Sequence, residues 1–109
     1  MRKIDELLRT LISDEITELK DPRLGFVTIT AVETSPDLAK ATVYFTVIGD
    51  AADTNAGLRS AGPRVRSRVA GRVRLRHMPE LEFSLDERAE AAFRVAEILS
   101  ELEQDNGED

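Results

Sequence analysis

Seven of the twelve arginines in this 109-residue chain lie in one short stretch, RSAGPRVRSRVAGRVRLR, from Arg59 to Arg76. The stretch contains no aspartate or glutamate. A planar guanidinium keeps its charge at any physiological pH and can donate two parallel hydrogen bonds to one phosphate. The run is therefore typical of a surface that binds a polyanion, which in a cytoplasm usually means nucleic acid.

The overall charge of the chain conceals this basic segment. The formal net charge is -6, yet residues 58–76 carry +7, residues 1–57 carry -4 and residues 77–109 carry -9. Because the Debye length is about 8 Å at physiological salt, acidic segments elsewhere need not cancel a basic stripe on another face. The local charge, and not the total, indicates what binds there.

Internal ion pairs are the alternative explanation for the arginines, since the chain holds 21 carboxylates. Inside the run, no acidic residue lies three or four positions from an arginine, so internal pairing explains single arginines better than all seven. We therefore predict RNA contacts from the whole run, with three further cations at turns and strand ends as weaker candidates. These residues are Arg59, Arg64, Arg66, Arg68, Arg72, Arg74 and Arg76, and then Lys20, Arg23 and Lys40.

Catalytic and metal-binding patterns are weak in this sequence. His77 is the only histidine, there is no cysteine, and the six glycines are isolated, so no nucleophile–base pair, thiolate site or phosphate-binding loop is indicated. The carboxylates fall mostly on expected helix faces, which makes a small hydrolase that uses them a disfavoured alternative. We predict a protein that is not an enzyme and has no catalytic residue, cofactor or metal.

The first half of the chain predicts a helix and a hairpin. Apolar residues between Ile4 and Leu19 recur at helical spacing, and Pro22 prevents the helix from continuing. Residues 26–34 and 40–48 are rich in β-branched and aromatic residues, and residues 35–38 supply turn chemistry between them. We expect two antiparallel strands with one buried face.

The second half predicts a helical region, a strand and a last helix. Leu58, Ala61, Val65 and Val69 form an apolar stripe that Gly62-Pro63 interrupts, which favours two short helices joined by a kink. Residues 81–85 alternate as a third strand. Asp86 can cap a helix that shows apolar residues on one face, namely Ala92, Val95, Ala96, Leu99 and Leu102.

These elements define one α+β domain over residues 1–102, with a three-stranded sheet packed on helices and a disordered acidic tail over 103–109. A kinked helix pair on a small sheet is the geometry of the KH module, which usually carries a GXXG loop. Here Ala61-Gly62-Pro63 stands at that position. We expect Ala61 and Gly62 to let the backbone amides at the break approach a phosphate.

Several motifs in fixed order resemble the ribosome-binding factor A family of bacteria, over nearly all of residues 1–100. In that family an Ala-x-Gly break replaces GXXG, and here Ala61 takes the alanine position while Pro63 takes the glycine position. The matching elements are Asp21-Pro22-Arg23, Val27-Thr28-Ile29, Asp37-Leu38, Val43-Tyr44, Pro79-Glu80-Leu81, Phe83 and Asp86.

The resemblance implies a type II KH-like domain that binds the small ribosomal subunit and its 16S rRNA and assists late rRNA maturation without catalysis, above all in the cold. The sequence has no cysteine and no apolar run long enough to span a membrane, so we expect a cytoplasmic protein without membrane contact. We also expect a monomer, with ribosomal proteins and assembly GTPases as further candidate partners. A protein–protein adaptor that binds basic ribosomal proteins through its acidic helices is the alternative function.

Overall fold

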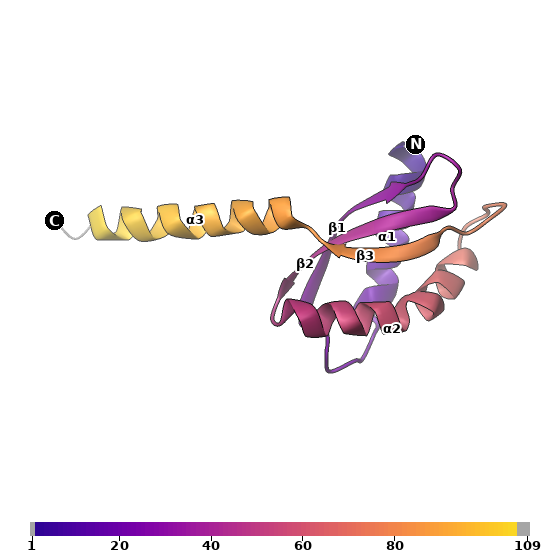
Figure 1. The fold of residues 1–109 in the computed structure, drawn as a ribbon, viewed down its shortest axis with the longest axis horizontal. Helices are drawn as coiled ribbons and strands as arrows, with labels where there is room; N and C mark the ends of the chain where they lie inside the picture. The colour runs from indigo at the N-terminus through magenta and orange to yellow at the C-terminus, as the bar shows by residue number, and fades with distance from the viewer. Residues whose placement is uncertain (1, 107–109) are drawn as a thin grey trace.

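A computed structural model describes residues 2–106 as three helices and a three-stranded sheet (Figure 1). The order of elements confirms the expected α+β architecture, since a helix, two strands, a helix, a strand and a helix follow one another. They are α1 (Arg2–Thr17), β1 (Phe26–Thr34), β2 (Lys40–Ile48), α2 (Ala51–Ala70), β3 (Glu80–Leu85) and α3 (Glu87–Asn106).

Helix α1 packs against β1 and α2 through one apolar face. Leu8, Leu11, Ile12 and Ile16 are buried at the spacing that the sequence predicts. Leu7 lies at the flank of this stripe and stays largely exposed. The helix ends before Pro22, whose ring cannot continue the hydrogen-bond ladder.

Strands β1 and β2 pair antiparallel, which confirms the expected hairpin. Ala41, Val43 and Phe45 of β2 are buried, and the residues between them are half-buried, so one face of the sheet forms the core. The register shifts between Ile29 and Ala31 of β1. Such a bulge changes the direction of the side chain within it, here that of Thr30.

Strand β3 pairs with the other edge of β2 and runs parallel to it, so the strand order is β1-β2-β3. Two parallel neighbours need a connection that crosses from one end of the sheet to the other. Helix α2 is this connection, and it packs mainly against β3 and α1. The arginine-rich segment is therefore the crossover of the fold.

The expectation of two short helices around Pro63 is wrong, because α2 is one continuous helix with Pro63 inside it. Asp50 caps its first turn, with Oδ1 accepting a hydrogen bond from the Asp53 amide at 2.9 Å. In Figure 1 the ribbon of α2 changes direction in its second half. The proline thus bends the helix without dividing it, since Leu58, Val65 and Val69 anchor both halves in the core.

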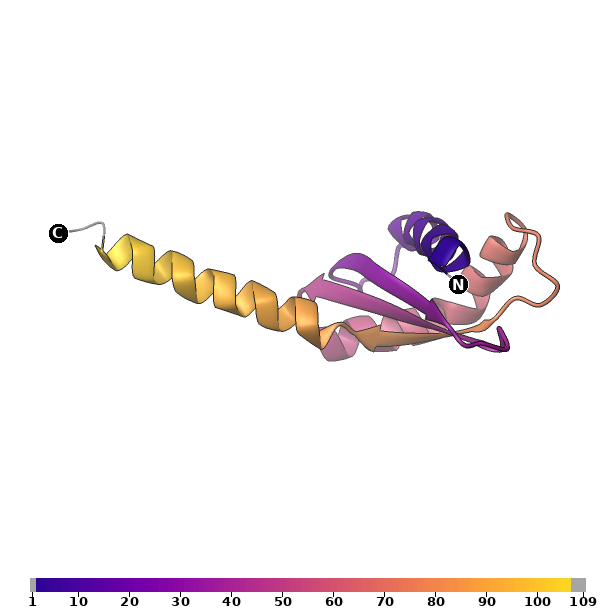
Figure 2. The same cartoon turned by 90° about the horizontal axis from the view of Figure 1, so that it is seen from above.

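Helix α3 leaves the end of the sheet and projects away from it (Figure 2). Asp86 caps it as expected: Oδ1 accepts from the Ala89 amide at 3.1 Å, and Oδ2 accepts from the Thr30 hydroxyl at 2.6 Å. These two contacts lower the pKa of Asp86, the Thr30 bond most. The cap therefore also ties the start of α3 to the bulge in β1.

The apolar face expected on the last helix is present but uncovered. Among residues 2–106, no other helix or strand packs extensively against α3. The helix runs to Asn106, so residues 103–106 of the expected tail are helical, while residues 107–109 lie outside the described residues. The boundary at residue 102 stays a prediction.

This arrangement predicts different stability effects for two leucines. Leu58→Ala in α2 removes a fully buried side chain and should lower the free energy of unfolding by about 2–5 kcal/mol. Leu99→Ala on α3 removes a side chain that packs on nothing in the sheet and should change it by less than about 0.5 kcal/mol. Urea unfolding followed by circular dichroism measures both, and equal losses would contradict the detached position of α3.

Candidate nucleic-acid interface

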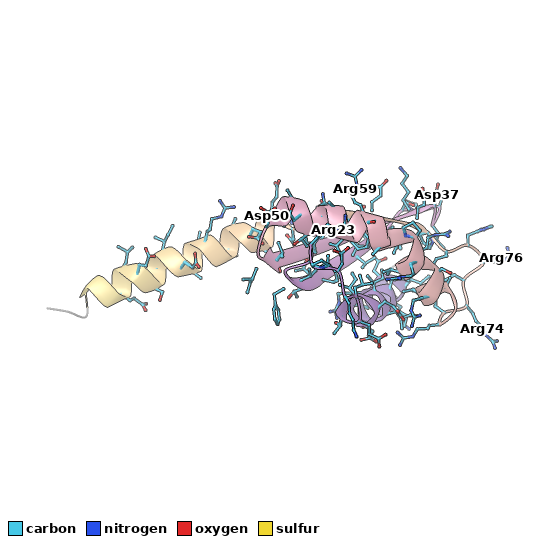
Figure 3. All side chains as sticks on the ribbon, turned by 90° about the horizontal axis from the view of Figure 1, so that it is seen from below. Arg23, Asp37, Asp50, Arg59, Arg74 and Arg76 are labelled. Atoms are coloured by element: carbon cyan, nitrogen blue, oxygen red, sulfur yellow. The ribbon has the colours of Figure 1, made fainter. Side chains whose placement is uncertain are left out.

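The side chains of four arginines of the run have no ion pair or hydrogen bond with any other residue that the structure describes: Arg59, Arg64, Arg74 and Arg76. All four side chains are exposed. Figure 3 shows Arg59 on α2 and both Arg74 and Arg76 on the loop after α2, each pointing away from the body of the protein. Their charges are therefore available to a ligand.

Arg68 and Arg72 instead bind the acidic side of α1. Arg68 Nε lies 2.6 Å from Glu15 Oε2, and Arg72 Nη1 lies 3.5 Å from Glu15 Oε1. Asp14 accepts Arg72 at 3.4 Å, and Glu18 lies 3.9 Å from Arg68. Three carboxylates thus surround two guanidiniums, so this cluster contributes no net positive charge to the surface.

Glu15 is the centre of this cluster and is itself buried, with only 7% of the residue exposed. The hydrogen bond from Arg68 is the main reason that the pKa of Glu15 lies below its ordinary value, and Arg72 adds to the effect. A buried carboxylate needs such partners. We conclude that Arg68 and Arg72 hold α1 to α2.

Arg66 has a third environment. Its Nε donates to the carbonyl oxygen of Pro79 at 3.0 Å, and its Nη2 donates to that of Met78. Carbonyl groups satisfy the donors of a guanidinium without neutralising its charge. Arg66 therefore fixes the chain at the entry to β3 and still contributes a positive charge.

Two grooves lie on either side of α2. A groove of about 930 Å³ between α2 and β3 is lined by two arginines and two glutamates, together with small and apolar residues: Arg59, Arg66, Glu80, Glu82, Gly62 and Phe83, among others. It also contains Asn55, whose Oδ1 is buried without a hydrogen-bond partner in the described part of the chain.

The second groove, of about 550 Å³, lies between α2 and the loop after α1. Lys20 from the loop and Ala61 and Arg64 from α2 line it together. Residues far apart in sequence thus place two cations beside a small side chain. The remaining weaker candidates do not join them, because Arg23 pairs with Asp21 at 2.6 Å and Lys40 with Glu82 at 3.2 Å.

The loop that carries Lys20 is held against the first half of α2. The hydroxyl of Thr54, which is fully buried, accepts from the Gly25 amide at 3.2 Å. A Cβ on Gly57 would lie 2.9 Å from Leu24 Cδ2, so glycine permits the close approach of loop and helix. Within the loop, the hydrogen bond from Arg23 lowers the pKa of Asp21 to about 2.

The expected role of Ala61 and Gly62 changes because α2 is continuous. Their amides lie within the helix and are not freed at a break. Pro63 has no N–H, so the group it leaves without its helical partner is the carbonyl oxygen of Arg59, which is an acceptor and not a donor. Gly62 is buried, and a Cβ there would lie 3.6 Å from the ring of Phe83. Gly62 is therefore a small residue that lines the larger groove where α2 packs against β3.

No helix in residues 2–106 is long and apolar enough to cross a membrane. Within the same residues, no three histidine, aspartate or glutamate side chains gather as metal ligands would.

Sequence reasoning missed the partners of Arg68 and Arg72 because they lie more than fifty residues away. One signal could have revealed them. Glu15 stands four positions after Leu11 and seven after Leu8, which places a carboxylate on the buried stripe of α1. A charge at such a position requires a cationic partner from another element.

A mixed three-stranded sheet with a helical crossover, and a basic surface on that crossover, define an α+β domain of the KH-like class. The chain belongs to the ribosome-binding factor A family: the model of that family matches residues 1–99. Ribosome-binding factor A of Desulfitobacterium hafniense is 43% identical over 98% of this chain and 89% of its own length. The same factor of Geobacter sulfurreducens is 39% identical over 98% of this chain and 94% of its own length.

Solved structures agree with this assignment. The crystal structure of ribosome-binding factor A from Thermus thermophilus matches with a TM-score of 0.74 and 32% identity, over 77% of this chain and 93% of that one. A homology model of the Thermus thermophilus factor, fitted into a cryo-EM map of a 30S complex, matches with a TM-score of 0.64 and 35% identity. The match covers 72% of this chain and 86% of that one.

The ion pairs that the buried Glu15 makes with Arg68 and Arg72 predict a pH-dependent stability. Because the folded pKa of Glu15 lies below its ordinary value of 4.5, its contribution is present above about pH 4.5 and is lost as the pH falls through the folded pKa. Glu15→Gln should therefore unfold at a lower temperature than the parent at neutral pH, and this difference should shrink as the pH falls below 4.5 and through the folded pKa. Thermal unfolding followed from neutral to acidic pH tests this, and a difference that does not change with pH would contradict it.

Proposed function

We propose that this protein binds the RNA of the small ribosomal subunit through the basic surface around α2. This basic surface comprises Arg59, Arg64, Arg66, Arg74, Arg76 and Lys20. The observation that carries the proposal is that four of these arginines are exposed and unpaired within residues 2–106, and that two of them, Arg59 and Arg64, line grooves on either side of α2.

Two further points support the proposal. Arg68 and Arg72 hold the α1–α2 junction, so the unpaired arginines gather at the grooves and at the loop after α2 and not along the whole helix. In addition, the relative from Thermus thermophilus was fitted into a map of a 30S complex. A protein of this family with an exposed basic surface is suited to the same kind of partner.

The proposed action uses binding energy alone. A domain that binds one RNA conformation more tightly than others shifts the population towards it and must later be displaced. We propose that this assists late maturation of the small subunit, without catalysis and in the cytoplasm. Its importance should increase in the cold, where misfolded RNA helices rearrange slowly. Ribosomal proteins and assembly GTPases are further candidate partners.

Arg64→Ala provides the direct test of RNA binding. Arg94→Ala is the matched control, because it also removes one exposed arginine but lies on α3. If four arginines meet phosphates, the affinity of the parent for the small-subunit rRNA should fall with salt with a logarithmic slope of about -3 to -3.5. Arg64→Ala should reduce this slope by about 0.7–0.9. Filter binding at several salt concentrations measures both.

Arg94→Ala should leave the slope unchanged because Arg94 lies on α3, away from the grooves. A slope near zero for the parent, or equal effects of the two substitutions, would reject RNA binding by this surface. That result would favour the adaptor alternative, in which acidic helices contact basic proteins and the arginines are secondary.

A further inference from the structure

Helix α3 carries an apolar stripe that nothing in the described structure covers. Val95, Ile98, Leu99 and Leu102 have exposed fractions between 53% and 56%. At about 100° per residue, these four side chains lie within an arc of roughly 100° on one side of the helix. Figures 1 and 2 both show the helix projecting away from the sheet.

A helix draws most of its stability in water from the packing of its apolar face. Large exposed aliphatic side chains gathered on one stripe are typical of a surface that another molecule covers. The stripe occupies two turns of α3, from Val95 to Leu102, and lies beyond the first turn, which the Asp86 cap holds in place. The geometry therefore points to a docking surface on α3.

The charge of α3 selects among possible partners. Residues 87–106 contain six acidic residues and two arginines, a net charge of -4. Glu101 and Glu103 flank the two edges of the stripe. Phosphates would be repelled by these carboxylates, and so would the identical helix of a second copy. A basic protein surface is the complementary partner.

Further apolar exposure lies at the same end of the molecule. Phe26 and Ile48 are cross-strand neighbours, with exposed fractions of 80% and 76%. Because β2 and β3 are parallel, Ile48 lies at the end of the sheet from which α3 departs. The two grooves lie on either side of α2, so α3 and these grooves can contact different molecules at once.

We propose that α3 inserts this stripe into an apolar groove with a basic rim on a protein of the small ribosomal subunit, while the basic surface around α2 contacts the RNA. The inference rests on the proposed function and names a second partner for it. Binding through two surfaces on one chain increases the affinity for the assembled particle without changing the affinity for naked RNA.

Site-specific photocrosslinking tests the nature of the partner. The full chain carries p-benzoylphenylalanine at Leu99 or, as the matched control, at Ser100 on the opposite side of α3. Each is irradiated with purified small ribosomal subunits, and the products are treated with ribonuclease or protease. We expect Leu99 to yield a nuclease-resistant adduct with one subunit protein, several times more efficiently than Ser100.

An adduct with RNA, an adduct with a second copy of the chain, equal yields from the two positions, or no adduct from Leu99 would each overturn the inference. The crosslinked protein, identified by mass spectrometry, should carry excess lysine and arginine around the adduct. An acidic or neutral surface there would also overturn it.

Two double variants measure how much the apolar stripe of α3 contributes to the affinity for the small ribosomal subunit. Leu99→Ala with Leu102→Ala should bind intact small subunits roughly tenfold more weakly than the parent, because hot-spot side chains of this size carry about that much. Its affinity for naked rRNA and its unfolding temperature should stay unchanged. Glu97→Ala with Ser100→Ala, on the other side of the helix, should retain most of the subunit affinity.

These outcomes separate the inference from the proposed function. If the parent binds subunits, Arg64→Ala weakens binding and the leucine variant does not, then only the docking of α3 is wrong. If the parent binds neither subunits nor rRNA, the proposed function fails, and the inference is rejected with it.

Discussion

The parallel pairing of β2 with β3 is the constraint on which the other features depend. Parallel strands cannot be joined by a tight turn, so the chain must cross the sheet, and α2 makes this crossing. The crossing buries the stripe of Leu58, Val65 and Val69 and leaves the arginines between them on the outside. It also creates the groove between α2 and the free edge of β3, and it directs α3 away from the sheet at the end opposite the loop after α2.

Within the arginine run, the buried Glu15 decides which charges are used for folding. Its carboxylate binds Arg68 of α2 and Arg72 of the loop directly after it, and leaving this buried carboxylate unpaired would be costly. Arg66 has a related structural task at Met78 and Pro79 but keeps its charge, because its partners are carbonyl groups. The run therefore combines two functions, since some of its members hold the fold and others remain available to a ligand.

Much of the fold follows from local pattern. Helical spacing in α1, alternation in β2 and the cap at Asp86 were each predicted at the right place, because burial repeats with the period of the element. The break at Pro63 was predicted wrongly. A proline costs a helix about 3 kcal/mol, and the burial of Leu58 and Val65 on either side offsets that cost, so the helix bends and continues. Local propensity could not reveal this compensation.

The sequence by itself determined the order of elements, the family and the concentration of positive charge between Arg59 and Arg76. Only the tertiary structure decided which arginines are free, that Lys20 joins Arg64 at one groove, and that the apolar face of α3 has no cover in residues 2–106. The physical reason is the range of the interactions. Hydrophobic period and charge run along the chain, whereas ion pairs, grooves and the covering of a helix face depend on residues that folding brings together from distant positions.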